Sequence, residues 1–288
     1  MRRFAAVITV AVLLVSGTVA PARAITGNYE PDYVHPFVGL AVFYDADGEF
    51  LHRCSGSLLT PIVFLTAGHC VDEATSARVY FQQDAGVNYD PETELDPVTG
   101  YPEDCYTQPC TTGSQLFNFG FSDFSGLPNT QDLGIVILDE PISLDAYGVL
   151  PAVGTLDPLD TKRGRQNLVF TDSGYGLSES NPVHVESYRE RLMATSRLVN
   201  LKSALTAGFN LQTTNNPGNG SGGTCSGDSG GPIFYPSDSF VIVAVTSFGL
   251  NEWCRGVDFA YRTDQQEAID WIVGVADQFG EAGNLIFA

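Results

Sequence analysis

The sequence predicts an all-β protein built from barrels or sandwiches, and three observations support this prediction. Short runs rich in β-branched and aromatic residues recur along the chain, separated by Gly, Pro, Asn and Asp. Only one segment, near the C-terminal end, has the periodicity of an amphipathic helix. The 288 residues are 43% hydrophobic, which is enough to bury the core of one large or two small domains.

The predicted strands share a short length, an apolar character and boundaries at turn-forming residues. In chain order they cover residues 36–44, 54–59, 77–82, 134–138, 168–171, 187–198 and 239–248. The predicted helix begins at residues 264–267, a sequence that resembles a capping box. Its apolar face is formed by Ile269, Ile272, Val273 and Phe279. We expect this face to pack on the β-rich body.

Two segments lack the strand pattern and are predicted to be loops. Residues 83–131 are rich in Asp, Pro, Gly and Thr, and they contain Cys105 and Cys110. Residues 213–223 are too rich in glycine for a regular element. The carboxylates of the first loop suit a hard cation such as Ca²⁺, but they lack a spaced ligand signature, so a solvated loop is preferred.

The charge excludes polyanionic partners. The chain has 34 acidic and 14 basic residues, a formal net charge of −20. Such a protein repels phosphate backbones and anionic lipid headgroups. We therefore expect neither nucleic-acid binding nor attachment to a membrane surface.

Residues 1–24 are predicted to be a signal peptide. Arg2 and Arg3 form a basic start, residues 4–15 an apolar run, and residues 22–24 an A-x-A cleavage site. The alternative is an uncleaved membrane anchor, but the apolar run is shorter than the roughly 20 residues that span a bilayer. We therefore expect a secreted, extracellular protein with no membrane contact after removal of this segment.

The six cysteines are an even set, and in an exported protein we expect them to form disulfides. Their spacing alone leaves the pairing open. The chain has no C-x-x-C pair and only four histidines, which disfavours a structural zinc site. We expect neither a metal nor a cofactor.

Three short motifs contain the candidate chemistry. GTCSGDSGGP at residues 223–232 sets Ser229 among glycines, where backbone N–H groups can converge beside a nucleophile. LTAGHC at residues 65–70 places His69, a base suited to neutral pH, after an apolar strand. Asp132 directly precedes another apolar run, where an unpaired carboxylate would be costly. The three residues can act as nucleophile, base and orienting carboxylate.

With these motifs the chain resembles the chymotrypsin/trypsin-like serine protease family, in which His, Asp and Ser occur in this order. The matching motifs are TAGHC, DLGIVIL, GDSGGP, SGYG at residues 173–176 and TSFG at residues 246–249, and they cover nearly all of the chain after residue 24. The resemblance implies two six-stranded antiparallel β-barrels with the active site between them. We place the first barrel, with its long loop, in residues 25–150. The second, with the terminal helix, takes residues 151–288.

The resemblance also implies roles for individual residues. Ser229 would attack the scissile carbonyl, His69 would take its proton, and Asp132 would orient His69. The backbone N–H groups of Gly227 and Ser229 would form the oxyanion hole. The implied substrate-binding residues are Gly223, Thr224, Ser247, Phe248 and Gly249.

Disulfides and activation follow from the same resemblance. The implied pairs are Cys54–Cys70 and Cys225–Cys254, with Cys105–Cys110 as the remainder. Removal of the signal peptide would expose Ile25, whose ammonium would meet Asp228 without a separate zymogen step.

Gly223 stands where family members that cut after Arg or Lys usually have Asp. The resemblance therefore implies a P1 preference other than simple Arg or Lys, with apolar side chains favoured. Asp258 is an alternative partner for a cationic P1 residue, and Phe259 is an alternative residue that narrows the pocket. We expect a monomer with protein or peptide substrates and proteinaceous inhibitors. The alternative functions are a catalytically silent binding protein of the same fold and an esterase with the same triad.

Overall fold

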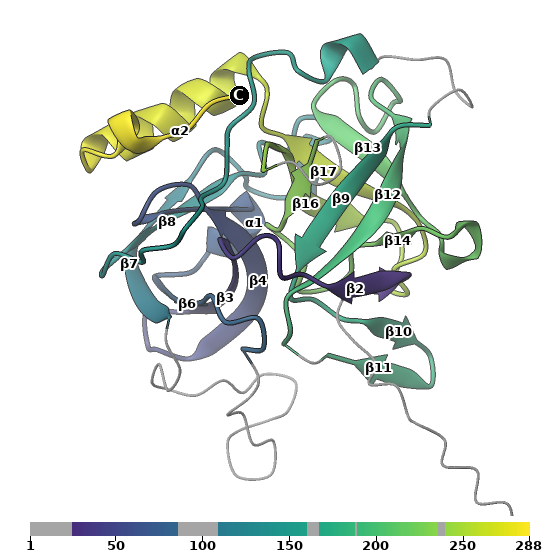
Figure 1. Cartoon of the computed structure of the whole chain (residues 1–288), viewed down its shortest axis with the longest axis horizontal. Coiled ribbons are helices and arrows are strands. Elements are labelled where there is room, and N and C mark those ends of the chain that lie inside the picture. The colour runs from purple at the N-terminus through teal and green to yellow at the C-terminus, as the bar shows by residue number, and fades with distance from the viewer. Residues whose placement is uncertain (1–24, 86–108, 160–166, 188, 236–239) are drawn as a thin grey trace, which may run out of the picture.

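The structure, a computed structural model, describes residues 25–85, 109–159, 167–187, 189–235 and 240–288 (Figure 1). Two β-barrels lie side by side, and a helix near the C-terminus lies over the first barrel. The predicted all-β class and the predicted C-terminal helix are confirmed. The expected signal peptide lies outside the described residues.

The first barrel is closed and has six antiparallel strands in the order β3-β4-β5-β8-β7-β6. They are β3 (Val38–Tyr44), β4 (Phe50–Leu58), β5 (Val63–Thr66), β6 (Ser76–Tyr80), β7 (Cys110–Asn118) and β8 (Gly134–Leu138). Every residue of β8 is buried, which explains why its sequence is continuously apolar.

Strand β7 corrects the prediction that residues 83–131 form one loop. Most of its side chains are exposed or only half-buried, so it lacks a clear apolar alternation. A short 3₁₀ helix, η1 (Phe124–Gly126), lies in the same segment. Cys105 and most of the acidic residues considered for Ca²⁺ lie outside the described residues.

The second barrel also has six strands, in the order β13-β17-β16-β15-β9-β12, and it is closed by pairing between β12 and β13. The strands are β9 (Val169–Gly174), β12 (Leu192–Asn200), β13 (Asn210–Asn215), β15 (Pro232–Phe234), β16 (Ile242–Gly249) and β17 (Gly256–Arg262). The predicted pair of six-stranded barrels is therefore confirmed. A hairpin of β10 (Glu179–Asn181) and β11 (His184–Glu186) projects from this barrel (Figure 1).

The segment 213–223, predicted to be a loop, is partly regular. It contains the end of β13, the 3₁₀ helix η3 (Pro217–Asn219) and the short strand β14 (Gly222–Gly223). Its glycines do not prevent pairing, because β14 is held by β1 (Thr26–Gly27). The next strand, β2 (Tyr29–Pro31), pairs with β12. Strand β2 therefore extends the sheet of the second barrel, while β1 and β14 form a separate two-stranded sheet, although the predicted domain division assigns residues 26–31 to the first barrel.

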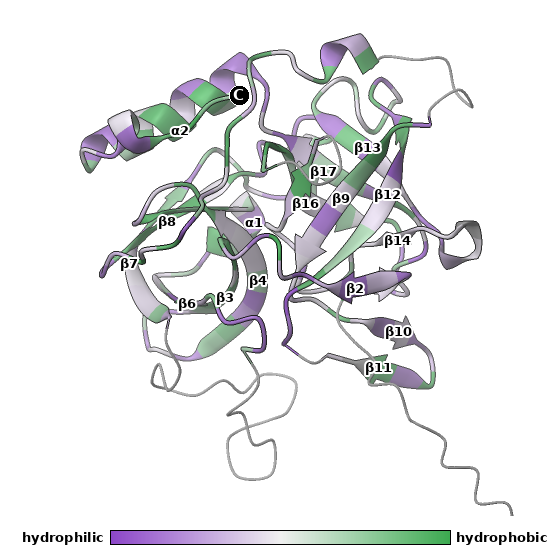
Figure 2. Ribbon diagram, viewed as in Figure 1, coloured by the Kyte–Doolittle hydropathy of each residue, from purple (hydrophilic) through white to green (hydrophobic). Residues whose placement is uncertain are grey.

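The helix α2 (Gln266–Gln278) packs on the first barrel. Its buried residues are Ala268, Ile269, Ile272, Val275 and Ala276, and Figure 2 shows separate apolar and polar bands along it. The predicted capping box is wrong, because the N-cap is Gln265 and its side chain makes no capping hydrogen bond. Asp264 instead accepts hydrogen bonds from Arg262 and from the Leu156 N–H. No helix within the described ranges is long and apolar enough to cross a bilayer.

The remaining short helices are α1 (Gly68–Val71), η2 (Asp157–Leu159) and η4 (Ala282–Asn284).

Arg191, a buried residue just before β12, ties the two barrels together. Its guanidinium donates to the backbone carbonyls of Val38 (3.2 Å) and Phe81 (3.1 Å), both on the first barrel. Its Nε donates to the carbonyl of Asp32 at 3.0 Å. These bonds satisfy a charge that would otherwise be costly to bury.

Candidate active site

The imidazole of His69 and the carboxylate of Asp132 meet at the ends of two paired strands. β5 ends at Thr66 and leads into α1, which contains His69. β8 pairs with β5 with Thr66 opposite Gly134, so Asp132, which precedes β8, lies beside α1. The fully buried carboxylate accepts hydrogen bonds from the His69 backbone N–H (2.8 Å) and from His69 Nδ1 (2.9 Å).

This contact fixes the tautomer of the neutral imidazole. An ionised carboxylate only accepts hydrogen bonds, so Nδ1 holds the ring proton and Nε2 is left as the basic nitrogen. Ser247, on β16, donates its hydroxyl at 2.5 Å to Oδ2 of Asp132, the oxygen that also faces His69 Nδ1, while Oδ1 accepts from the His69 backbone N–H. Donors to both oxygens offset the cost of burying the charge. Because Ser247 belongs to the second barrel, the site is assembled across both barrels.

The turn around Ser229 depends on two glycines in left-handed conformation. Gly227 has φ 95° and Gly230 has φ 80°, values that residues with side chains rarely adopt. A Cβ atom on Gly230 would lie 2.0 Å from Oγ1 of Thr66. The residue after Ser229 therefore packs directly on the strand end that leads to His69.

Ser55, on β4, holds the same turn from the first barrel. Its backbone N–H donates to the carbonyl of Ser229 at 2.7 Å, and its hydroxyl donates to the carbonyl of Gly227 at 2.9 Å. No motif in the sequence marks Ser55 as part of the site. Among the described residues, no hydrogen bond joins the hydroxyl of Ser229 to His69, although their segments are in contact.

Asp228 is a fully buried carboxylate beside the turn. It accepts hydrogen bonds from the backbone N–H groups of Gly176 (2.7 Å) and Cys225 (2.9 Å), and burial raises its pKa to about 7. Ile25 is also fully buried, but its nitrogen is a peptide amide in the full chain. Within the described residues, no hydrogen bond or ion pair joins Ile25 to Asp228.

A pocket of about 380 Å³ opens beside Ser229. Two segments form its walls, residues 224–226 and residues 246–252, and Cys254, which also lines the pocket, is joined to Cys225 by a disulfide. Four of the expected substrate-binding residues, Thr224, Ser247, Phe248 and Gly249, line this pocket.

The sequence model of the Trypsin family matches residues 27–272. The chain belongs to the trypsin family.

Three trypsin-family relatives illustrate the distance within the family. The chain is 26% identical to brachyurin of Leptuca pugilator over 226 residues, covering 77% of this chain and 87% of that protein. It is 25% identical to the CLIP domain-containing serine protease B10 of Anopheles gambiae over 268 residues, which cover 87% of this chain and 68% of that protein. It is also 25% identical to the human chymotrypsin-like elastase family member 3B over 264 residues, which cover 87% of this chain and 88% of that protein.

Solved structures agree on the fold. The HL collagenase structure matches with a TM-score of 0.62 at 19% identity, covering 88% of this chain and 98% of that one. Human heparin binding protein matches with a TM-score of 0.59 at 18% identity, over 87% of this chain and 96% of that structure. A scabies mite inactivated protease paralogue, S-I1, matches with a TM-score of 0.57 at 17% identity, over 88% of this chain and 99% of that structure. The trypsin fold is therefore found in structures named as a protease, a binding protein and an inactivated paralogue.

Asp258, on β17, lines the pocket and is almost fully buried. Burial raises its pKa to about 6, although it accepts hydrogen bonds from the Thr224 N–H (2.7 Å) and from Asn215 Nδ2 (2.9 Å). Gly223 lies behind this carboxylate, since a Cβ atom there would be 2.6 Å from Asp258 Oδ2 and 2.3 Å from Asn215 Cγ. The pocket therefore has its carboxylate on β17, and position 223 has no room for a side chain.

Phe259 does not narrow the pocket, contrary to the alternative considered from the sequence. Its ring is fully buried and stacks on Phe248 with centroids 4.6 Å apart and an interplanar angle of 3°. The alternation of side chains along β17 explains the difference, because Asp258 and Phe259 must point to opposite faces.

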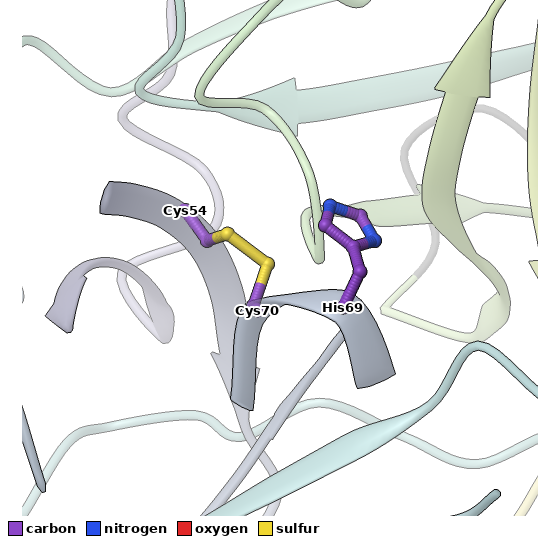
Figure 3. A group of neighbouring side chains, drawn as sticks. All are labelled: Cys54, His69 and Cys70. Carbon is purple, nitrogen blue, oxygen red and sulfur yellow. A yellow bond between two sulfur atoms is a disulfide. The ribbon is translucent and has the colours of Figure 1, made fainter. Parts of the chain in front are cut away.

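The cysteines beside His69 form a disulfide and offer no thiolates to a metal. Cys54 on β4 is bonded to Cys70 on α1, and the ring of His69 projects from the same short helix (Figure 3). The three side chains lie close together, but only a free thiolate is a strong metal ligand. Cys110 is also disulfide-bonded, and Cys105 lies outside the described residues.

Proposed function

We propose that this trypsin-family protein is a secreted serine endopeptidase. One observation supports this most strongly: the buried carboxylate of Asp132 orients His69 from one barrel while Ser247 supports it from the other. This arrangement keeps Nε2 of His69 basic and free to take a proton. A fold used only for binding has no need of such an oriented base.

In the proposed reaction, Ser229 Oγ forms a bond with the scissile carbonyl carbon as its proton passes to His69 Nε2. The imidazolium that results is stabilised by Asp132. Collapse of the tetrahedral intermediate breaks the C–N bond, and His69 returns the proton to the leaving amine. Water then attacks the acyl-enzyme by the same proton route, which releases the acid and restores Ser229.

The backbone N–H groups of Gly227 and Ser229 are the proposed donors to the oxyanion. Their turn is held by Ser55, whose two hydrogen bonds fix the carbonyls of both residues. Prepositioned donors are worth about 3 to 4 kcal/mol each in the transition state of related reactions.

The proposed substrates are proteins or peptides bound in extended form. Residues 247–249 end β16 along the pocket, where their backbone can pair with a substrate strand. Phe248 offers an apolar wall and Asp258 a carboxylate, so we propose that P1 includes apolar and basic residues rather than Arg or Lys alone. Proteinaceous inhibitors would occupy the same strand position.

Activation is proposed to follow release of Ile25 as a new N-terminus. The carboxylate of Asp228 has two backbone donors but no ion-paired cation within the described residues. An ammonium from Ile25 would neutralise this buried charge and stabilise the turn around Ser229. Removal of the predicted signal peptide would supply it.

The test is labelling of the purified, secreted protein with a fluorophosphonate, with the adduct located by peptide mass spectrometry. We expect an adduct on Ser229, none in Ser229→Ala, and hydrolysis of casein by the unlabelled protein that is lost once Ser229 is labelled. An unlabelled chain that begins at Ile25 would instead support the silent binding protein. Ester hydrolysis without casein hydrolysis would support the esterase.

A further inference from the structure

Asn215, the last residue of β13, connects the N-terminal strand to the wall of the pocket. It is fully buried. Its Oδ1 accepts a hydrogen bond from Oγ1 of Thr26 at 3.2 Å. Its Nδ2 donates to the carbonyl of Thr224 at 2.8 Å and to both oxygens of Asp258, at 2.9 Å and 3.1 Å.

The register of the second barrel creates this contact. β13 pairs with β17 with Thr213 opposite Asp258, so Asn215, two residues further, is the diagonal neighbour of Asp258 on the same face. The β1–β14 pairing then sets Thr26 opposite Gly223. Since Gly223 has no side chain, the amide of Asn215 fits between Thr26 and Asp258.

Only one orientation of the Asn215 amide satisfies these neighbours. Its NH₂ group faces two acceptors, the Thr224 carbonyl and the Asp258 carboxylate, whereas its oxygen faces a hydroxyl donor. A rotated amide would set its oxygen against two acceptors and leave buried groups unpaired, which is costly. The hydroxyl of Thr26 therefore helps to fix the donor that holds Asp258.

We propose that Asn215 is a positioning residue that couples the docked N-terminal strand, through Thr26, to the Asp258 carboxylate and so determines the preference for a basic P1 side chain. This inference rests on the proposed endopeptidase function. Asn215 acts through Asp258 and not on the reacting atoms.

The electrostatic surroundings of Asp258 make this donor important. Two other buried carboxylates, Asp172 on β9 and Asp228 beside the Ser229 turn, interact unfavourably with Asp258. Burial disfavours the charged form of Asp258, whereas the hydrogen bonds from Thr224 and Asn215 favour it. Loss of the Asn215 donor would raise the pKa of Asp258 above its present value of about 6. Binding of a cationic P1 group would then need a higher pH.

The experiment compares Asn215→Ser and Thr26→Val with the unchanged protein on two peptides that differ only at P1, Lys or Phe. We expect the ratio of kcat/KM for Lys over Phe to fall about tenfold in Asn215→Ser and about threefold in Thr26→Val at pH 7. The acid limb of the Lys profile moves to higher pH in both variants, whereas the acid limb of the Phe profile stays in place.

The matched control is Asn210→Ser, at the other end of the same strand. Asn210 is equally buried, but its amide donates to the carbonyls of Pro128 and Leu205, away from the pocket. This variant loses stability for a similar reason, and we expect it to leave the Lys to Phe ratio and both pH profiles unchanged.

An unchanged ratio and an unchanged Lys profile in both variants would overturn the inference, provided that Ser229 is still labelled by the fluorophosphonate. If Asn215→Ser does not fold, the isosteric Thr26→Val variant decides alone. Failure of the unchanged protein to cut after Lys at any pH would also overturn the inference. Absence of labelling in the unchanged protein would instead overturn the proposed function.

Discussion

Replacement of Asp132 by Asn tests the proposed base directly. The oxygen of the new amide must face the His69 backbone N–H, because an NH₂ group there would oppose a second donor and cost about 1 to 3 kcal/mol. The NH₂ group then faces Nδ1 of His69 and the hydroxyl of Ser247, which can accept. It donates to Nδ1 and moves the ring proton to Nε2, so the base is lost.

The expected loss of kcat/KM is large because the variant keeps the folded structure but holds His69 in the wrong tautomer. We expect kcat/KM to fall about 10⁴-fold, which corresponds to about 5 kcal/mol of transition-state stabilisation. The assay is hydrolysis of a chromogenic peptide at pH 7 to 8, with folding checked by thermal unfolding.

Asp139→Asn is the matched control. Asp139 follows β8 as Asp132 precedes it, and its carboxylate accepts hydrogen bonds from Thr112 and Ser114 on the solvent side. We expect the kcat/KM of Asp139→Asn to change by less than twofold. A loss of less than tenfold in Asp132→Asn, or an equal loss in both variants, would refute the reasoning.

Three further predictions concern stability. Replacing Cys225 and Cys254 by Ser removes a disulfide that closes a loop with a sequence separation of 29. We expect the free energy of unfolding to fall by about 3 to 4 kcal/mol. An unchanged melting temperature in calorimetry would contradict this. Arg262→Met leaves the buried carboxylate of Asp264 without its cation. We expect a loss of about 3 to 5 kcal/mol in the free energy of unfolding, measured in urea, with unchanged activity per folded molecule. A loss below about 1 kcal/mol would be inconsistent with a buried ion pair. Asp228, with a pKa raised by burial from 3.8 to about 7, binds a proton in the folded chain that the unfolded chain loses near pH 4. While Ile25 is still peptide-bonded, the free energy of unfolding should therefore fall as pH rises from about 4 to 7, and Asp228→Asn should reduce that slope; equal slopes in urea titrations would argue against it.

The sequence predicted those features that depend on local pattern. The five residues of β8 are all buried, so the strand was evident as an apolar run, and the carboxylate before it pointed to a partner. The short glycine-rich turn around Ser229 was equally local. The pair of His69 and Asp132 followed because each residue adjoins a recognisable strand.

Features that depend on distant pairing could not be predicted in this way. The contact between Asn215 and Asp258 exists because β13 and β17 pair in one register, and the sequence of residues 213–223 suggested only a loop. Strand β7 has too many solvent-facing side chains for a clear pattern. Asp264 was predicted to cap the helix, but its carboxylate accepts hydrogen bonds from Arg262 and from the Leu156 N–H instead.

Because Arg191 donates to backbone carbonyls on both barrels, moving one barrel relative to the other would break buried hydrogen bonds to a charged group, which is costly. With the barrels held in this way, we expect a polypeptide substrate to supply the extended conformation itself when it binds beside Ser229. Ordering each of its residues costs about 1 to 2 kcal/mol of conformational entropy. The proposed endopeptidase should thus prefer denatured chains and long mobile loops, and folded proteins with short tight turns should resist it however well their side chains match the pocket.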